Sequence, residues 1–386
     1  MKDVTISKDI LYVGVDDTDL DLFESQYIIP NGVSYNSYVI MDEKITVMDT
    51  VDARKTDEWL QNLESVLKGA TPTYLVVSHM EPDHAASIQV LMEKYPQMQI
   101  VGNAKTFAMI PQFFDVDLTG RMVSVQEGDT LNLGNHTLQF IMAPMVHWPE
   151  VMVAYEQTEK ILFSADGFGK FGALDTDEAW TCEARRYYFN IVGKYGAQVQ
   201  VLLKKAATLD IQMICPLHGP ILKEDLGYYI GKYDIWSKYE PEDEGVFIAY
   251  ASIHGNTAKA AKKLAELLEA KGAKRVAIAD LARDDMAEAV EDAFRHDKLI
   301  VASATYDGGL FPCMEDFLSH LKAKNYQKRT VALVENGSWA PMAAKKMTEY
   351  FSTMKNITIC QPIVSIKSTM SKENLKIMEE LAEKLI

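Results

Sequence analysis

The chain has 386 residues, of which 48% are hydrophobic, 24% charged and 10% aromatic. At about 100–200 residues per domain, this length fits two domains or three, and the composition excludes disordered and fibrous proteins. A formal net charge of -16 disfavours binding to nucleic-acid phosphates. No apolar run reaches the roughly 18 residues that span a bilayer, and the first residues lack the apolar segment of a signal peptide. We expect a cytoplasmic protein that binds neither nucleic acid nor a membrane.

The four cysteines are scattered along the chain, and none belongs to a Cys-x-x-Cys pair. They are Cys182, Cys215, Cys313 and Cys360. This spacing excludes a metal centre built on Cys-x-x-Cys pairs and predicts buried thiols in a reducing compartment.

The first half of the chain mixes short strands with helices. Two β-branched runs flank Asp42-Glu43, which predicts a hairpin, and residues 184–206 have a helical pattern. Strands are predicted at 33–41, 44–51, 74–78, 99–102, 137–143, 151–155, 160–164 and 212–215. We expect a mixed sheet structure with helices over residues 1–240.

The stretch 239–245 (YEPEDEG) is acidic, contains Pro and Gly, and has no apolar periodicity. It predicts a domain boundary that contributes nothing to a core. Strands then alternate with helices, which predicts a doubly wound parallel sheet over residues 245–386. The predicted strands are 246–250, 275–278, 298–303, 330–334 and 358–366, and the helices are 257–271, 285–294, 314–323, 340–352 and one from Lys372.

Four potential metal ligands follow the predicted strand 74–78. They are His79, Glu81, Asp83 and His84, and in an extended chain the first three point to one side. Three more ligand-type residues, His147, Asp166 and His218, follow later strands. One such histidine alone is better explained by a hydrogen bond to a loop, whereas seven residues of this kind predict two adjacent metal ions. Three further histidines have no other potential ligands beside them and are predicted to lie at the surface: His136, His296 and His320.

A second group of polar residues follows the predicted strand 246–250. Ser252 and Thr257 carry hydroxyls, Gly255 frees backbone N–H groups, and a helix begins after them, which suits a phosphate monoester. No Lys follows the Gly, so a Walker A nucleotide loop is excluded. The loops that end the third and fourth strands reach the same edge of the sheet, where open α/β sheets bind ligands. The predicted ligand-binding residues are Ser252, His254, Gly255, Asn256, Thr257, Ala304, Thr305, Tyr306, Asp307, Gly308, Asn336, Gly337, Ser338 and Trp339.

Each half resembles a known family. The segment 79–84 and its later partners resemble the metallo-β-lactamase superfamily, whose hydrolases carry H-x-H-x-D-H, which implies an N-terminal αββα sandwich. Glu81 stands where those hydrolases have a second His, and the added carboxylate shifts the metal preference from zinc towards iron or manganese. The second half resembles flavodoxin, which implies that its first loop holds the phosphate of FMN and that Tyr306 and Trp339 can stack on the flavin ring.

Together the halves resemble the flavodiiron proteins, also called A-type flavoproteins, over nearly the entire chain. The motifs are H-x-E-x-D-H at 79–84, HWPE at 147–150, SADGFG at 164–169 and PLHGP at 216–220. The resemblance implies one iron on His79, Glu81 and His147, another on Asp83, His84 and His218, and Asp166 as the bridge. It leaves open whether His84 binds iron directly. It assigns no catalytic residue beyond the ligands, and Trp148 and Tyr195 are candidates for the surrounding layer.

The resemblance also implies an activity. Flavodiiron proteins reduce dioxygen to water, nitric oxide to nitrous oxide, or both, and receive electrons from rubredoxin or a related reductase. In this family a head-to-tail dimer brings the FMN of one subunit to the irons of the other, and we expect such a homodimer, or a dimer of dimers, here. The ligands do not reveal the preferred gas. Two alternatives are a dizinc hydrolase with an accessory flavodoxin-like domain and a non-enzymatic flavin electron carrier or sensor.

Overall fold

The computed structural model describes residues 4–386 and divides into two compact units. The first unit runs to Tyr188 and resumes over Ala197–Tyr233, and the second comprises Phe189–Gly196 and Asp234–Ile386. None of the helices in residues 4–386 is both long and apolar enough to cross a bilayer. The two units are described separately below.

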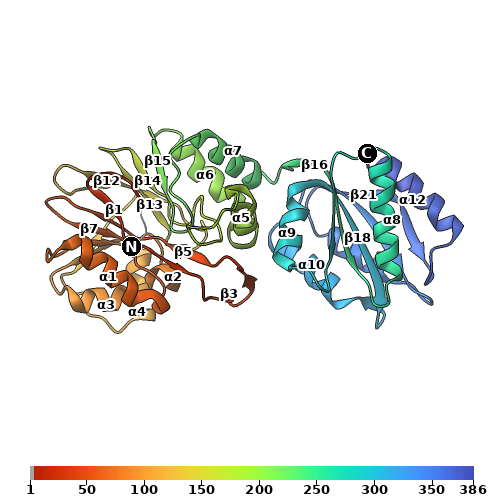
Figure 1. Cartoon of the computed structure of the whole chain (residues 1–386), viewed down its shortest axis with the longest axis horizontal. Helices are drawn as coiled ribbons and strands as arrows, with labels where there is room; N and C mark the ends of the chain where they lie inside the picture. Colours follow the sequence, from red (N-terminus) through yellow and green to blue (C-terminus); the bar gives the residue numbers. More distant parts are fainter. Residues whose placement is uncertain (1–3) are drawn as a thin grey trace. The chain divides into compact units, whose positions relative to one another are not determined.

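Two mixed sheets form the centre of the first unit (Figure 1). One has the order β1-β6-β7-β8-β9-β10 and the other the order β11-β12-β13-β14-β15. The strands of the first are β1 (Ile10–Tyr12), β6 (Tyr38–Ile40), β7 (Thr46–Met48), β8 (Tyr74–Val76), β9 (Gln99–Gly102) and β10 (Met122–Ser124). Those of the second are β11 (Thr130–Asn132), β12 (Thr137–Met142), β13 (Met152–Glu156), β14 (Ile161–Phe163) and β15 (Met213–Cys215). Two small ribbons pair β2 (Val15–Asp17) with β5 (Val33–Tyr35) and β3 (Leu22–Phe23) with β4 (Tyr27–Ile28).

The two sheets pack face to face through alternate apolar side chains. Tyr38 and Val76 from the first sheet belong to the same buried cluster as Phe140 and Phe163 from the second. Helices cover the outer faces, so the unit is the αββα sandwich that the resemblance implies (Figure 1). The helices between residues 56 and 237 are α1 (Thr56–Leu67), α2 (Pro82–Ala85), α3 (Ile88–Lys94), α4 (Ala104–Phe113), α5 (Trp180–Tyr187), α6 (Gly196–Ala206) and α7 (Leu226–Ser237).

The second unit is a parallel sheet with the strand order β17-β16-β18-β20-β21. This 2-1-3-4-5 order is that of flavodoxin-like folds. The strands are β16 (Asp243–Ala251), β17 (Val276–Asp280), β18 (His296–Tyr306), β20 (Arg329–Asn336) and β21 (Ile357–Ile366), and β19 (Gly309–Leu310) pairs antiparallel with β18.

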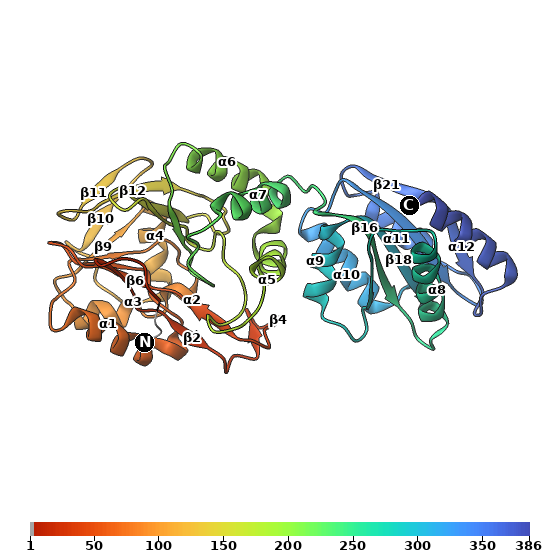
Figure 2. The ribbon, with the colours of Figure 1, turned by 45° about the horizontal axis from the view of Figure 1, so that its top comes forward.

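Helices cover both faces of this sheet, as Figures 1 and 2 show. Side chains of α8 and α12 share a buried cluster with alternate residues of the strands, among them Ile248 and Ile300. The intervening residues face the opposite way, where Phe247 contacts Phe317 of α10. The helices are α8 (Asn256–Ala270), α9 (Met286–Arg295), α10 (Pro312–Ala323), α11 (Ala343–Phe351) and α12 (Lys372–Lys384).

The structure corrects two sequence predictions about the fold. The stretch 239–245 does contribute to a core, because Tyr239 is buried and β16 already begins at Asp243. The thiols are not uniformly buried, since Cys215 is buried but Cys182 is exposed. The predicted hairpin at Asp42-Glu43 is confirmed, because β6 and β7 on either side of it pair antiparallel.

Candidate diiron and flavin sites

The predicted ligands converge because each follows a strand of the two central sheets. The loop after β8 carries His79 and Glu81, and α2 begins at Pro82, which is preorganised for the first position of a helix. His147 lies between β12 and β13, whereas Asp166 and His218 follow the adjacent parallel strands β14 and β15. The seven side chains fall into two groups. Within each group, the ligand atoms all lie within 4.8 Å of one another.

The first group contains His79, Glu81, His147 and Asp166. Glu81 Oε2 lies 3.2 Å from His79 Nε2 and 2.9 Å from His147 Nε2. Asp166 Oδ2 lies 3.3 Å from His79 Nε2 and 3.4 Å from His147 Nε2. Two ligand atoms that each lie about 2.1 Å from one ion, at tetrahedral or octahedral angles, are about 3.0–3.4 Å apart. The first group therefore has the dimensions of a metal shell.

The second group contains Asp83, His84 and His218. Asp83 Oδ2 lies 3.3 Å from His84 Nε2 and 3.2 Å from His218 Nε2, and these two nitrogens are 3.0 Å apart. Asp166 Oδ1 lies 3.3 Å from His84 Nε2. The two oxygens of Asp166 thus face different groups, which is the geometry of a bridging carboxylate.

The buried carboxylates of this cluster lack ordinary hydrogen-bond partners. Both side-chain oxygens of Asp83 and of Asp166 are buried without a hydrogen bond. Burial of unpaired carboxylates is costly, and a cation removes that cost. Burial, together with the negative charges of Glu81 and Asp166, raises the pKa of Asp83 to about 7. The donor set therefore fits a pair of metal ions.

Glu81, Asp166 and His218 are in the protonation states that metal binding requires. Burial lowers the pKa of His79 and of His147, but the nearby carboxylates outweigh it and raise both values, so metal binding displaces a proton from each of these imidazoles. Burial by itself raises the pKa of Glu81 and of Asp166, but the neighbouring histidines outweigh it and hold both values below the usual range. Burial lowers the pKa of His218, which favours the neutral imidazole. Its Nδ1 lies 2.8 Å from the carbonyl oxygen of Ser34, so the proton sits on Nδ1 and Nε2 is left free for a metal.

Close packing leaves no room for a side chain beside the bridge. A Cβ at Gly169 would lie 3.0 Å from the carbonyl oxygen of Asp166 and 3.4 Å from Cβ of His218. Aromatic rings fill the remaining space, and His218 contacts Phe23, Tyr35 and Tyr187 edge-on or at a tilt. The second group is therefore surrounded by tightly packed aromatic side chains.

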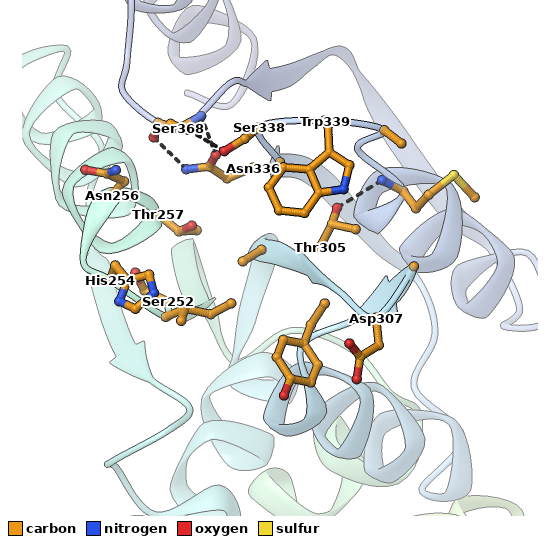
Figure 3. Close-up of a pocket in the computed structure, with 17 residues that line it drawn as sticks. Ser252, His254, Asn256, Thr257, Thr305, Asp307, Asn336, Ser338, Trp339 and Ser368 are labelled. Carbon is orange, nitrogen blue, oxygen red and sulfur yellow. Dashed lines mark hydrogen bonds between the residues drawn. The ribbon is translucent and has the colours of Figure 1, made fainter.

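A pocket of about 660 Å³ opens at the carboxyl edge of the sheet in the second unit. Ser252, His254 and Thr257 gather on one side of it, at the start of α8, while Trp339 and Asp307 lie across from them (Figure 3). All the predicted ligand-binding residues except Gly255 line the pocket, and Gly255 lies in the same loop with a φ of 87° that favours glycine. Neutral hydrogen-bond donors and one aromatic wall suit a phosphate-bearing aromatic cofactor.

Comparisons with known proteins match both halves of the chain. Residues 33–219 match the model of the ODP family beta lactamase, and residues 247–362 match that of a flavodoxin domain. An uncharacterized protein of Methanocaldococcus jannaschii is 30% identical, over 98% of this chain and 97% of the relative. An anaerobic nitric oxide reductase flavorubredoxin of Vibrio vulnificus is 28% identical, over 87% of this chain and 70% of the relative.

A solved structure matches almost the whole molecule. The rubredoxin oxygen:oxidoreductase of Desulfovibrio gigas superposes with a TM-score of 0.92 at 27% identity, covering 99% of this chain and 97% of the other. The chain belongs to the flavodiiron protein family. It is an oxidoreductase whose cofactors are FMN and a non-haem diiron centre.

The structure also shows site residues that the sequence did not single out in this flavodiiron protein. Glu150 is fully buried, and its Oε1 lies 2.8 Å from His79 Nδ1. Ser368 lines the flavin pocket and hydrogen-bonds both Asn336 and Ser338. The HWPE motif contains Glu150 three residues after His147, so it offered a signal, whereas Ser368 follows β21 without any motif.

Trp148 and Tyr195, the two residues predicted to lie around the metal ligands, have different positions. Trp148 contacts the rings of His79 and His147, with centroids 5.3 Å and 6.3 Å away. Tyr195 belongs to the other compact unit, Phe189–Gly196 with Asp234–Ile386, and Lys194 lies over its ring. Any action of Tyr195 on the gas preference stays a prediction.

The surface prediction for the remaining histidines is wrong at two of the three positions. His136 is buried against Asp42 and Glu159, and His296 is buried beside α9, whereas His320 is partly exposed. For His136 the reason is tertiary, because Asp42 is 94 residues away from it along the chain.

Proposed function

We propose that this flavodiiron protein reduces dioxygen to water or nitric oxide to nitrous oxide, and that FMN relays electrons from an external donor. The observation that carries the proposal is the presence, in one chain, of two ligand groups that share Asp166 and of a flavodoxin pocket. When bound, the irons and the flavin supply the redox chemistry, and together they store enough electrons for the four-electron reduction of dioxygen.

Each of the two groups of ligand residues is proposed to hold one iron. His79, Glu81 and His147 hold one iron, Asp83, His84 and His218 hold the other, and Asp166 bridges them. His84 is included as a direct ligand because its Nε2 faces Asp83, Asp166 and His218 at 3.0–3.3 Å.

The residues of the second unit have two roles towards FMN. The loop 252–257 and the first turn of α8 offer hydroxyl and backbone N–H donors to the phosphate. Tyr306 and Trp339 flank the place of the flavin ring, and Trp339 is 83% exposed, so its indole is free to stack.

Neither alternative is favoured. A dizinc hydrolase is disfavoured by the carboxylate of Glu81 and by the flavin pocket in the same chain. A carrier with a vestigial metal site is disfavoured because all seven ligand positions are filled.

The remaining proposals concern the partners. Rubredoxin or a related reductase is the proposed electron donor, in line with the names of the flavorubredoxin and rubredoxin oxygen:oxidoreductase relatives. The resemblance supports a head-to-tail homodimer or a dimer of dimers, and sedimentation at assay concentration tests this. A cytoplasmic location is proposed because Cys215, Cys313 and Cys360 are thiols outside any disulfide.

The experiment that tests the function starts from protein purified without oxygen. Elemental analysis and the flavin spectrum are expected to give two irons and one FMN per chain. Consumption of dioxygen and of nitric oxide is then measured with reduced rubredoxin as the donor. Two zincs without flavin, or flavin reduction without gas consumption, would contradict the proposal.

A variant of the bridge tests the ligand assignment. Asp166→Ala removes the carboxylate that both groups face, so both irons are expected to be lost while FMN is retained in the other unit. Metal and flavin content measure the result. Normal iron content in this variant would refute the bridge.

A further inference from the structure

The two proposed iron positions have matching ligands but different outer partners. Each has two imidazoles and one carboxylate of its own, and both share Asp166. We infer that the iron at His79, Glu81 and His147 is bound more tightly and held more firmly as Fe³⁺ than the iron at Asp83, His84 and His218. This inference rests on the proposed function, because it presupposes two irons.

A buried carboxylate supports the first position. Glu150 is 0% exposed, and its Oε1 lies 2.8 Å from His79 Nδ1. The same oxygen accepts a hydrogen bond from the backbone N–H of Met80, also at 2.8 Å, which fixes the carboxylate in place. His79 therefore donates its Nδ1 proton to an anion and presents Nε2 to the metal. A carboxylate partner of this kind raises the basicity of the imidazole.

The second position has no such anion. His218 Nδ1 donates to the neutral carbonyl oxygen of Ser34 at 2.8 Å. His84 Nδ1 is buried without a hydrogen-bond partner. One imidazole of this position is thus supported by a neutral acceptor, and the other by none.

The two positions therefore differ in the negative charge that surrounds the iron. Glu150 adds a negative charge behind one ligand of the first position, in a site that water does not screen. A negative charge stabilises Fe³⁺ more than Fe²⁺, so Glu150 would favour Fe³⁺ at the first position and leave the second position the easier one to reduce once both irons are bound. The same asymmetry makes the second iron the first to be lost to a chelator.

Asp49 is the competing source of charge near these rings. It is buried, and its Oδ1 accepts the backbone N–H of Ser78 at 2.6 Å. His84 and His79 both act on it electrostatically, but burial is the largest influence and raises its pKa to about 6. His84 Nδ1 nevertheless has no hydrogen-bond partner, so Asp49 does not support the second position as Glu150 supports the first.

The first test uses the unaltered holoprotein. Crystals are treated with an iron chelator until about half of the iron is gone, and anomalous diffraction locates what remains. Iron is expected to remain beside His79 and to be depleted beside His218. Equal depletion, or iron remaining mainly beside His218, would overturn the inference. Fewer than two irons in the untreated protein would instead defeat the proposed function.

The second test removes the charge but keeps the shape. Glu150→Gln still accepts the proton of His79, and the affinity of the first position for iron is expected to fall about 10–100-fold. The two phases of iron loss to the chelator should then merge, and the two reduction steps followed by electron paramagnetic resonance should move together. Unchanged phases in folded, FMN-loaded Glu150→Gln would overturn the inference.

A matched control separates the hydrogen bond from nearby charge in general. Asp49→Asn removes another buried carboxyl, and asparagine tolerates the φ of 54° at this position. This variant is expected to keep two phases of iron loss in the original order. Merged phases in Asp49→Asn as well would overturn the specific role of Glu150.

Discussion

At the scale of single residues, His136 joins parts of the N-terminal unit that are distant in sequence. Its Nδ1 lies 2.8 Å from Asp42 Oδ2, and its Nε2 lies 3.3 Å from Glu159 Oε1. Burial lowers the pKa of His136, but these two carboxylates outweigh it and raise the pKa above the usual value. The fold therefore favours the charged imidazole. Its contribution to stability is complete below the unfolded pKa of about 6.5 and is lost as the pH rises through the folded value.

The variant His136→Gln is accordingly expected to lower the melting temperature more at pH 6 than at pH 9. For a unit of this size, each 1 kcal/mol corresponds to about 2–4 °C. The matched control is His320→Gln, because His320 is partly exposed and faces only Asp316 on its own helix. If His136→Gln lowered the melting temperature equally at both pH values, the contribution of His136 would come from packing and not from its charge.

At the scale of elements, the start of α8 is the part of the second unit that we propose binds the phosphate of FMN. Gly255 has a φ of 87°, and its N–H bonds Ser252 Oγ, which shapes the loop before the helix begins at Asn256. Thr257 follows in the first turn and is 2% exposed. Its hydroxyl therefore has little access to bulk water and is available to the ligand.

We expect Thr257→Val to weaken FMN binding about tenfold while iron content stays unchanged. The loss corresponds to one hydrogen bond to a charged group, about 1.5 kcal/mol. Riboflavin, which has the same ring without the phosphate, should bind wild type and variant alike in a fluorescence titration. An equal loss of both flavins would indicate that the pocket had collapsed, and a bulky residue at 257 should weaken FMN further.

At the scale of the whole molecule, the two sites belong to compact units with separate cores. No sheet in residues 4–386 takes strands from both units. The αββα sandwich holds the proposed metal ligands, and the parallel sheet holds the proposed flavin pocket. Loss of one cofactor should thus leave the other site intact.

Calorimetry of the full chain is expected to show two transitions. Free FMN at 100 times its dissociation constant should stabilise the C-terminal transition by about 2.7 kcal/mol, because FMN binds only that folded unit. Iron chelation should lower only the other transition. A single transition that FMN shifts as a whole would mean that the units unfold together.

Much of this protein was predictable from local sequence. The β-α alternation after residue 245 predicted the parallel sheet, because buried strands and amphipathic helices each leave a short-range pattern. The cluster His79 to His84 was visible because four ligand types follow one buried strand. The loop from Ser252 to Thr257 was visible because a phosphate cradle is built from neighbouring residues.

The tertiary structure decided what depends on contacts between distant segments. It brings Asp166 between two groups of ligands that come from three other strand ends. It places Glu150 behind His79 but only a carbonyl behind His218. It also buries His136 against Asp42 and places Ser368 in the flavin pocket. Periodicity and motifs describe the neighbours of a residue along the chain, whereas hydrogen bonds, bridging and burial depend on which segments the sheets bring together.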